Sequence, residues 1–583
     1  MLSILFLLLS SVSLFADGPG GVQLFATLDG PQPLATVVNI SASIPGAARD
    51  AYWFRFRIKG LDGSYSMIRD FGPIASLDWT VYDREGVVEM EVSARENATG
   101  AITVESMPYE WTAIASNAVV VTPTQHPLVY LYSAPPCRKG LTSHVQFSVT
   151  GGQSQTTPAK ACDGAHTMNF LIAGVPQNTE ITLEDSITNT TTVVSTRKRK
   201  FHTKALPASA DIPAKLPLIS DGPAPTSGLM LFCSLPPNPQ TITDLSGNLV
   251  WYLPTAVSYI TRPVGGGRFL AVFEAPSRQA DQRFIEFDLM GLIVKDTNAA
   301  RVNEQLTAMG KKSIGSFHHE ARLLPNGNFL VMASEERLLT GVQGPGTVDV
   351  IGDMILVLDQ DLNVQWAWDA FDWLDPHRTA VLNEGCAQGG CPPLFLAKQA
   401  NDWTHGNAAS LAPDGSILYS SRHQDWLIKI NYENGSGDGR ILWRLGKDGD
   451  FFMDSMLANP WFSHQHDAHF LAGDTAHIQL FDNGNTRLVT DPTATSRGQV
   501  LEIDEQKRTA RLQLNSDLGV YSFALGSAQQ LQNGDYHFTA GWTPAVASRH
   551  LEVDASGKVV RTMDLSQTVY RSFRLADIYS DSQ

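Results

Sequence analysis

Three stretches of the sequence begin with histidine and continue as two apolar segments joined by a tight turn. They are His319-Glu-Ala-Arg-Leu-Leu-Pro-Asn-Gly-Asn-Phe-Leu-Val, His405-Gly-Asn-Ala-Ala-Ser-Leu-Ala-Pro-Asp-Gly-Ser-Ile-Leu and His466-Asp-Ala-His-Phe-Leu-Ala-Gly-Asp-Thr-Ala-His-Ile-Gln-Leu. Asn-Gly and Asp-Gly pairs favour hairpins because both turn positions need positive φ. Each stretch therefore predicts two antiparallel strands, with a histidine at the start of the first.

A second repeated element lies between these hairpins: a strand that ends in Asp, a turn and another strand. It recurs six times, near Asp244, Asp288, Asp359, Gly439, Asp504 and Asp554. Two hairpins per unit give four strands, and four-stranded units repeated around an axis are the blades of a β-propeller. The sequence therefore predicts an all-β protein with a six-bladed β-propeller over residues 229–583.

The chain before the repeat is also predicted to be β structure. Phe54-Arg-Phe-Arg-Ile and Val88-Glu-Met-Glu-Val alternate with a period of two, so residues 17–123 are expected to form an immunoglobulin-like β-sandwich. A small β domain is expected over 124–205, and a linker rich in Pro, Ala and Ser over 206–228. Helical content should be low. The best helix candidate, 362–374, fits a strand and a loop equally well.

Composition and the N-terminus limit the possible partners and compartment. The formal net charge of -16 argues against a nucleic-acid partner, which needs a basic groove. Residues 1–16 contain an apolar run and indicate a secretory signal, with a buried first strand as the alternative. No other segment approaches the roughly 18 apolar residues of a membrane span. A periplasmic or secreted protein is expected.

The five cysteines fit an exported protein, in which disulfides persist. Cys386 and Cys391 enclose a short loop that can close easily, and Cys137 and Cys162 can form a second pair. Cys233 stands in an apolar segment and is expected to be a buried free thiol. Because no cysteine stands beside a histidine, a cysteine nucleophile is not indicated.

The matching histidines are expected to converge, because equivalent strand starts form a ring at one mouth of a propeller. A regular strand points alternate side chains to opposite faces, so only one of His318 and His319 is expected to face the axis, and we favour His319. Arg422 is preferred to its neighbour His423, since an anion site needs a fixed positive charge. His464 is expected to lie farther out.

An ordered series of motifs resembles the arylsulfotransferase family, the aryl-sulfate sulfotransferases that work without phosphoadenosine phosphosulfate. The motifs are Asp402-Trp-Thr-His-Gly-Asn, Ser420-Ser-Arg-His-Gln, Ile441-Leu-Trp-Arg-Leu-Gly, Gln465-His-Asp-Ala and Leu480-Phe-Asp-Asn-Gly. The resemblance covers roughly residues 230–583. It implies a six-bladed propeller, export to the periplasm and a central histidine that is transiently sulfated.

By motif, the resemblance assigns the nucleophile and its companions. His466 would be the nucleophile, and the resemblance gives the catalytic companions His405, Arg422 and His319 and the substrate contacts Asn407 and His318. Sulfuryl transfer, like phosphoryl transfer, spreads charge over oxygen atoms in a loose transition state. A nucleophilic imidazole, cationic donors and a proton-transferring histidine suit it. Either His319 or His405 remains open as the proton-transfer partner.

The expected activity is transfer from a phenolic sulfate ester to a phenol by a ping-pong mechanism, with no cofactor and no metal. The phenol needs apolar walls, for which Trp403, Trp461 and Phe462 are candidates, although blade packing explains them equally well. Two alternatives stay open. Three histidines suit a zinc or copper site, against which Arg422 argues, and a secreted propeller also serves as a non-enzymatic binding scaffold.

Overall fold

The computed structural model describes residues 21–48, 50–60, 62–149, 152–189, 192–222, 227–275, 277–386 and 391–581. The predicted signal at 1–16 lies outside these residues. Strands dominate the described part of the chain and its three α-helices are short, so the protein is all-β, as predicted. None of the described helices is long and apolar enough to cross a membrane.

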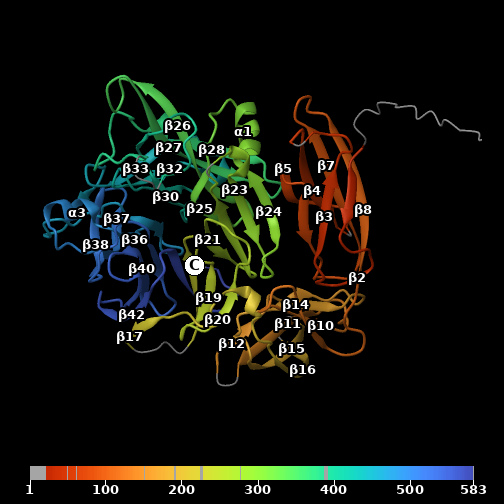
Figure 1. Cartoon of the computed structure of the whole chain (residues 1–583). Helices are drawn as coiled ribbons and strands as arrows, with labels where there is room; N and C mark the ends of the chain where they lie inside the picture. The colour runs from red at the N-terminus through yellow and green to blue at the C-terminus, as the bar shows by residue number, and fades with distance from the viewer. Residues whose placement is uncertain are drawn as a thin grey trace, which may run out of the picture.

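The first strands form two sheets of an N-terminal unit, coloured red in Figure 1. One sheet has the order β1(Gln23–Ala26), β3(Val38–Ser43), β6(Ser76–Trp79). The other begins a nine-stranded sheet that continues into the repeat, and its first five strands are, in order, β2(Gln32–Pro33), β8(Ile102–Thr112), β7(Gly86–Glu96), β4(Tyr52–Lys59) and β5(Tyr65–Gly72). Alternation in β4 and β7 buries one face of the second sheet, which is the pattern that the sequence predicted.

Two further sheets follow, below the first unit in Figure 1. The three-stranded sheet consists of β9(Val120–Pro123), β10(Tyr130–Ala134) and β14(Met168–Ile172). The five-stranded sheet consists of β11(Thr142–Val149), β12(Ser154–Thr156), β13(Lys160–Ala161), β15(Glu180–Asn189) and β16(Thr192–His202). The predicted disulfide Cys137–Cys162 is present here, as Cys386–Cys391 is later in the chain, and Cys233 is a buried free thiol, as predicted.

Six sheets carry the repeat, and the second of them is continuous with the N-terminal strands in the nine-stranded sheet. The first sheet consists of β18(Leu229–Ser234), β19(Thr241–Asp244), β20(Leu249–Tyr252) and β43(Val569–Leu575), and the second of β21(Tyr259–Val264), β22(Arg268–Phe273), β23(Arg283–Phe287) and β24(Ile293–Asn298). The third consists of β25(Phe317–Leu323), β26(Phe329–Thr340), β27(Thr347–Leu358), β28(Val364–Asp369) and β29(Asn401–Asp402), and the fourth of β30(Gly406–Leu411), β31(Ile417–Ser421), β32(Trp426–Ile430) and β33(Ile441–Gly446). The fifth consists of β34(Phe452–Met453), β35(His466–Phe470), β36(His477–Asp482), β37(Arg497–Asp504) and β38(Thr509–Asp517), and the sixth of β39(Ser527–Gln530), β40(Tyr536–Thr543), β41(Ala547–Val553), β42(Val559–Leu565) and β17(Ile219–Asp221). β17 comes from the predicted linker 206–228 and pairs with β42.

The six sheets are connected through one strand of each. In the series β21, β25, β30, β35, β39 and β43, each strand contacts the next, and β18, which pairs with β43, contacts β21. The repeated Asp accepts hydrogen bonds from the turn that joins two neighbouring strands of its sheet. The Asp244 carboxylate accepts the backbone N–H of Ser246 and Asn248, both at 2.9 Å, and Asp288, Asp359 and Asp554 repeat this geometry. Asp504 accepts instead from Gln506 and Lys507.

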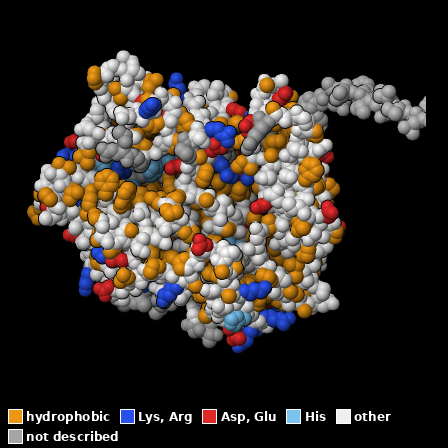
Figure 2. Space-filling model, in the orientation of Figure 1, with side chains coloured by type: hydrophobic (Ala, Val, Ile, Leu, Met, Phe, Trp, Pro, Cys, Tyr) orange, Lys and Arg blue, Asp and Glu red, His pale blue; other side chains and the backbone are white. Residues whose placement is uncertain are grey.

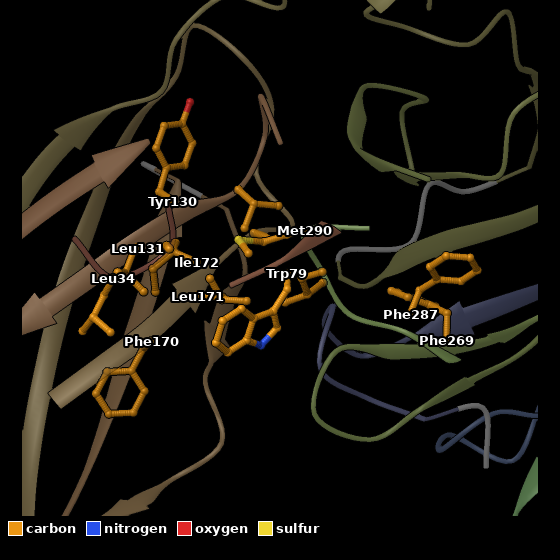
Figure 3. Packing of buried hydrophobic residues seen from close by; sticks show 14 of the residues in the cluster. Leu34, Trp79, Tyr130, Leu131, Phe170, Leu171, Ile172, Phe269, Phe287 and Met290 are labelled. Atoms are coloured by element: carbon orange, nitrogen blue, oxygen red, sulfur yellow. The ribbon is translucent and has the colours of Figure 1, made fainter. Parts of the chain in front are cut away.

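The N-terminal unit of β1–β8 contacts the sheets of the repeat through a buried ion pair and a shared hydrophobic core. β5 and β24 join two sheets in parallel at Arg69 and Asp296, whose side chains form a buried ion pair at 2.5 Å. One hydrophobic core continues from the front strands into the first two sheets of the repeat, and Figure 3 shows part of it. Trp79, Phe170 and Phe269 all belong to it.

The helices are few and differ from the expected one. The longest, α1(Ala299–Ala308), begins at Asn298, whose side chain accepts the backbone N–H of Arg301, a favourable N-cap. The candidate segment 362–374 divides instead into β28 and the single turn α2(Ala370–Trp373). The third helix is α3(Asn485–Thr490).

A buried network of charges joins four of the six connecting strands. Arg262 of β21 binds Glu320 of β25 at 2.9 Å and also binds Asp467 of β35. Arg571 of β43 binds Glu320 at 3.1 Å, and the four side chains are almost fully buried. Burial would raise the pKa of Glu320, but the neighbouring arginines lower it to about 2. The network therefore ties strands that lie far apart in the sequence.

Neutralising Glu320 should destabilise the fold strongly. Glu320→Gln leaves the buried arginines short of a carboxylate, which costs about 3–5 kcal/mol of unfolding free energy for a broken buried ion pair. Urea denaturation measures the loss, and Glu89→Gln is the matched control because Glu89 is partly exposed and 4.0 Å from Lys59. A loss no larger than that of the control would contradict the role given to the network.

Candidate active site

Five imidazoles follow one another where three of the connecting strands begin. The ring centroids lie 4.9 Å apart for His318 and His319, 5.0 Å for His319 and His405, 4.4 Å for His405 and His423, and 5.6 Å for His423 and His464. The structure therefore brings His319 and His405 together across 86 residues of chain. His423 and His464, which the sequence placed outside the site, belong to the same series.

The expectation that strand alternation would separate neighbouring side chains was wrong because these strands are irregular at the site. His319 has a φ of 59° and interrupts the pairing of β25 with β26. His405, just before β30, has a φ of 44°. Arg422 and His423 lie in the turn after β31 and contact each other. Bulges re-aim side chains, so both members of each adjacent pair reach the site.

Asn483 fixes the tautomer of His466. The Asn483 Nδ2 group donates to the backbone carbonyls of Ser522 at 2.9 Å and Leu525 at 3.1 Å. Its Oδ1 therefore faces His466 Nδ1 at 2.6 Å and accepts its proton. The lone pair of His466 lies on Nε2, where it accepts a hydrogen bond from the Leu525 backbone N–H at 3.2 Å. Burial first, and then the charge of Arg422, holds the pKa of His466 well below its usual value, so the ring is neutral.

A carboxylate orients His405. Asp402 Oδ2 accepts the proton of His405 Nδ1 at 2.5 Å, which leaves His405 Nε2 available for proton transfer. The backbone carbonyl of Asp402 also accepts His423 Nδ1–H at 2.7 Å. Asp402 thus orients two imidazoles at once, His405 through its carboxylate and His423 through its backbone carbonyl.

His319 is oriented through His318. The His318 Nε2 atom lies 3.1 Å from Asp353. Burial alone would lower the pKa of His318, but Asp353 raises it above its usual value. Charged His318 then donates from Nδ1 to His319 Nδ1 at 2.8 Å. His319 is kept neutral by burial and by the charge on His318, which hold its pKa well below the usual value, so its own proton lies on Nε2.

Arg422 is buried beside this cluster with donors to spare. Its Nη1 donates to His423 Nε2 and its Nη2 donates to the Phe523 carbonyl at 3.2 Å, whereas its Nε, also buried, has no protein partner. Glu384, from the segment between α2 and β29, binds His464 Nε2, and Asp425 binds His464 Nδ1 at 2.9 Å. Burial alone would lower the pKa of His464, but these two carboxylates raise it.

The structure buries the other residues that the sequence predicted as substrate contacts, Asn407, Trp403 and Phe462. Asn407 is fully buried, donates to the Gln465 carbonyl at 2.7 Å and accepts Arg571 on its own carbonyl at 2.6 Å, but its Oδ1 is unpartnered. Trp403 and Phe462 are buried in the cores between sheets, so packing accounts for them. Sequence reasoning missed Asp402, Glu384 and Asn483, although Asp402 and Asn483 lie inside motifs that it singled out.

The histidines do not arrange themselves as a three-histidine metal site. Over the described residues, the groups whose ligand atoms lie close enough to share an ion are Glu384–His423–His464, Asp402–His405–His423 and Cys386–Cys391–Asp402. The cysteines of the last group are disulfide-bonded. Both nitrogens of His423 and of His464 already bind protein groups. These two imidazoles therefore have no free nitrogen to offer a metal ion.

A family model described as Arylsulfotransferase (ASST) matches residues 226–574, which include all of these histidines. The chain belongs to the arylsulfotransferase family. Membership supports aryl sulfotransferase activity, with small aryl sulfates and phenols as substrates. No curated protein matches the chain. A solved structure of chicken CNTN1 FN1–FN3 domains matches with 10% identity over 60% of this chain and 97% of that one, at a TM-score of 0.13, which is too low to support any argument.

The pKa shifts of this arylsulfotransferase predict opposite effects of pH on stability. His466 and His319 stay neutral when folded but take up protons near pH 6.5 when unfolded, so their stabilisation is lost as pH falls below about 6.5. His464 has a raised folded pKa, so its stabilisation is lost as pH rises through that pKa. Urea midpoints between pH 5 and pH 8 should fall less steeply with acid in His466→Gln, and less steeply with alkali in His464→Gln. Profiles parallel to wild type would contradict the assigned charges.

Proposed function

We propose that the chain transfers a sulfuryl group from a phenolic sulfate ester to a phenol by a ping-pong mechanism through N-sulfohistidine at His466. The observation that carries the proposal is the hydrogen bond from His466 Nδ1 to Asn483. This bond leaves a neutral imidazole with its lone pair on Nε2, and neutral imidazole is the nucleophilic form. The nearby positive charge of Arg422, which lowers the pKa of His466, suits an anionic substrate.

We further propose that the six sheets are the blades of a six-bladed β-propeller. Their four-stranded repeat, the series of contacts from β21 to β43 and the completion of the β18–β20 sheet by the last strand support this architecture. In a propeller the connecting strands line the axis, so their first residues meet at one mouth. The histidine series is the consequence expected of that geometry.

In the first step, His466 Nε2 gives up the hydrogen bond from the Leu525 backbone N–H and attacks sulfur while the bond from sulfur to the phenolic oxygen breaks. His405, which enters this step as an imidazolium paired with Asp402, gives the proton on its Nε2 to the departing phenolate, while its Nδ1–H stays hydrogen-bonded to Asp402. The sulfated ring keeps its proton on Nδ1 and therefore carries a positive charge. This charge makes neutral imidazole a good leaving group for the second step, and Asn483 Oδ1 keeps the proton on Nδ1.

In the second step, a phenol replaces the product and His405 Nε2 takes its proton. The phenolic oxygen attacks sulfur, the bond to His466 Nε2 breaks, and both histidines return to their starting state. The transferred group carries negative charge on its oxygens, which preorganised donors stabilise in a buried site. His319 Nε2–H and the free donors of Arg422 supply them, with His318 and Asn407 as the groups behind them.

The choice of His405 for proton transfer rests on its partner. Asp402 accepts from His405 at 2.5 Å, whereas His319 has an imidazole partner, His318, which holds it as a neutral donor. A carboxylate stabilises an imidazolium as it forms, and an imidazolium partner opposes it. The two histidines that the sequence left as alternatives therefore take different roles.

Export to the periplasm or out of the cell is part of the same proposal. Two disulfides, Cys137–Cys162 and Cys386–Cys391, support an oxidising compartment. A binding scaffold without activity is the weaker alternative, because tautomer-fixing contacts to His466, His405 and His319 serve chemistry rather than adhesion.

Removing the nucleophile should abolish transfer. His466→Ala is expected to lose turnover of 4-nitrophenyl sulfate with phenol as acceptor, whereas wild type should give parallel double-reciprocal lines for the two substrates. His377→Ala is the matched control, because His377 is exposed and bonds only to Asp375 in its own turn. Transfer that persists in His466→Ala would refute the nucleophile assignment.

Removing the Asn483 contact that fixes the tautomer of His466 should slow catalysis without abolishing it. Asn483→Ala is expected to lower kcat by about 10- to 100-fold, since a misoriented reacting group commonly costs this much. Loss of the Nδ1 acceptor should also lower the pKa of His466, because Asn483 raises it, and so shift the acid limb of the kcat/KM profile to lower pH. An unshifted acid limb would indicate a purely structural role for Asn483.

A further inference from the structure

Two large aromatic side chains are exposed next to the reacting groups. Phe523 is 55% exposed and Trp542 is 50% exposed, and their rings form an edge-on pair with centroids 6.1 Å apart. Large aromatic residues are normally buried for much of their area. An adjacent exposed pair therefore calls for a binding partner, which isolated surface residues do not.

Backbone hydrogen bonds hold the Phe523–Trp542 pair next to Arg422 and His466. The Phe523 carbonyl accepts from Arg422 at 3.2 Å, and Leu525, two residues on, donates its backbone N–H to His466 at 3.2 Å. The Phe523 N–H donates to the Trp542 carbonyl at 3.2 Å, so the two residues are fixed to each other. The Phe523 ring centroid lies 5.9 Å from the Arg422 guanidinium carbon.

Two exposed apolar side chains also follow a backbone contact with His423. The Val381 backbone N–H donates to the His423 carbonyl at 2.8 Å, and Val381 and Leu382 are each 38% exposed. Arg422 and His423 are thus hydrogen-bonded to two segments that carry exposed apolar side chains. Figure 2 shows histidine side chains recessed in the surface near β30 and β32, with hydrophobic side chains beside them toward α3.

We propose that Phe523 and Trp542 form a shelf for the aromatic part of the substrate, and that the shelf favours substrates with two fused rings over single-ring phenols. This inference rests on the proposed sulfuryl transfer. A sulfuryl group held by Arg422 places the first ring against Phe523, because that ring lies beside the guanidinium. A single ring ends there. A second fused ring extends along the pair to Trp542 and gains contact with it.

The test compares two acceptors in the full-length protein, with 4-nitrophenyl sulfate as donor. Trp542→Ala should raise KM for 2-naphthol by about 5- to 20-fold, as expected for a lost aromatic contact and its buried area, with kcat little changed. KM for phenol should rise by less than about 2-fold, because phenol does not reach Trp542. Phe523→Ala should raise both KM values.

Phe452→Ala is the matched control, because Phe452 is 70% exposed and lies in β34, which pairs with β38 on another part of the surface. Its kinetics should equal those of wild type, and Trp542→Leu repeats the test if the alanine variant folds poorly. Equal changes for phenol and 2-naphthol, or none, would overturn the shelf while leaving the transfer reaction intact. Absence of transfer to any phenol in wild type would overturn both proposals.

Discussion

The buried charge network at the junction of the connecting strands is the constraint on which the site depends. Glu320 and Asp467 bind Arg262 there, and each follows directly in sequence after a site histidine, His319 and His466. Buried charges are tolerated only when they are paired, so these carboxylates have little freedom. The peptides that carry them consequently hold the two imidazoles in place from opposite parts of the chain.

The same environment divides the histidines into two classes. Burial among positive groups keeps His466 and His319 neutral, whereas carboxylates raise the pKa of His318 and His464. A neutral nucleophile and a neutral donor can thus stand beside Arg422 without adding charge that would need compensation. Environment, rather than residue type, decides what each imidazole can do.

Much of the fold could be predicted from short-range signals, whereas the site could be predicted only in outline. Asp turns and Asn-Gly hairpins act within a few residues, so the four-stranded unit was predictable from sequence. The convergence of His319 and His405 followed from the repeat. The local bulges at His319 and His405, and the contacts of Asn483 with the loop of Ser522 and Leu525, depend on distant strands. No local sequence pattern predicts contacts between residues that lie far apart in the chain. The exposed pair Phe523–Trp542 also depends on such contacts and was not predicted.

The most direct test of the central claim is the intact mass of wild-type protein after brief exposure to 4-nitrophenyl sulfate without an acceptor, followed by peptide mapping. Transfer through N-sulfohistidine predicts the gain of one sulfuryl group, located on His466 and lost when phenol is added. Release and transfer of the sulfuryl group with no change in protein mass, or a modification mapped to a different residue, would contradict it.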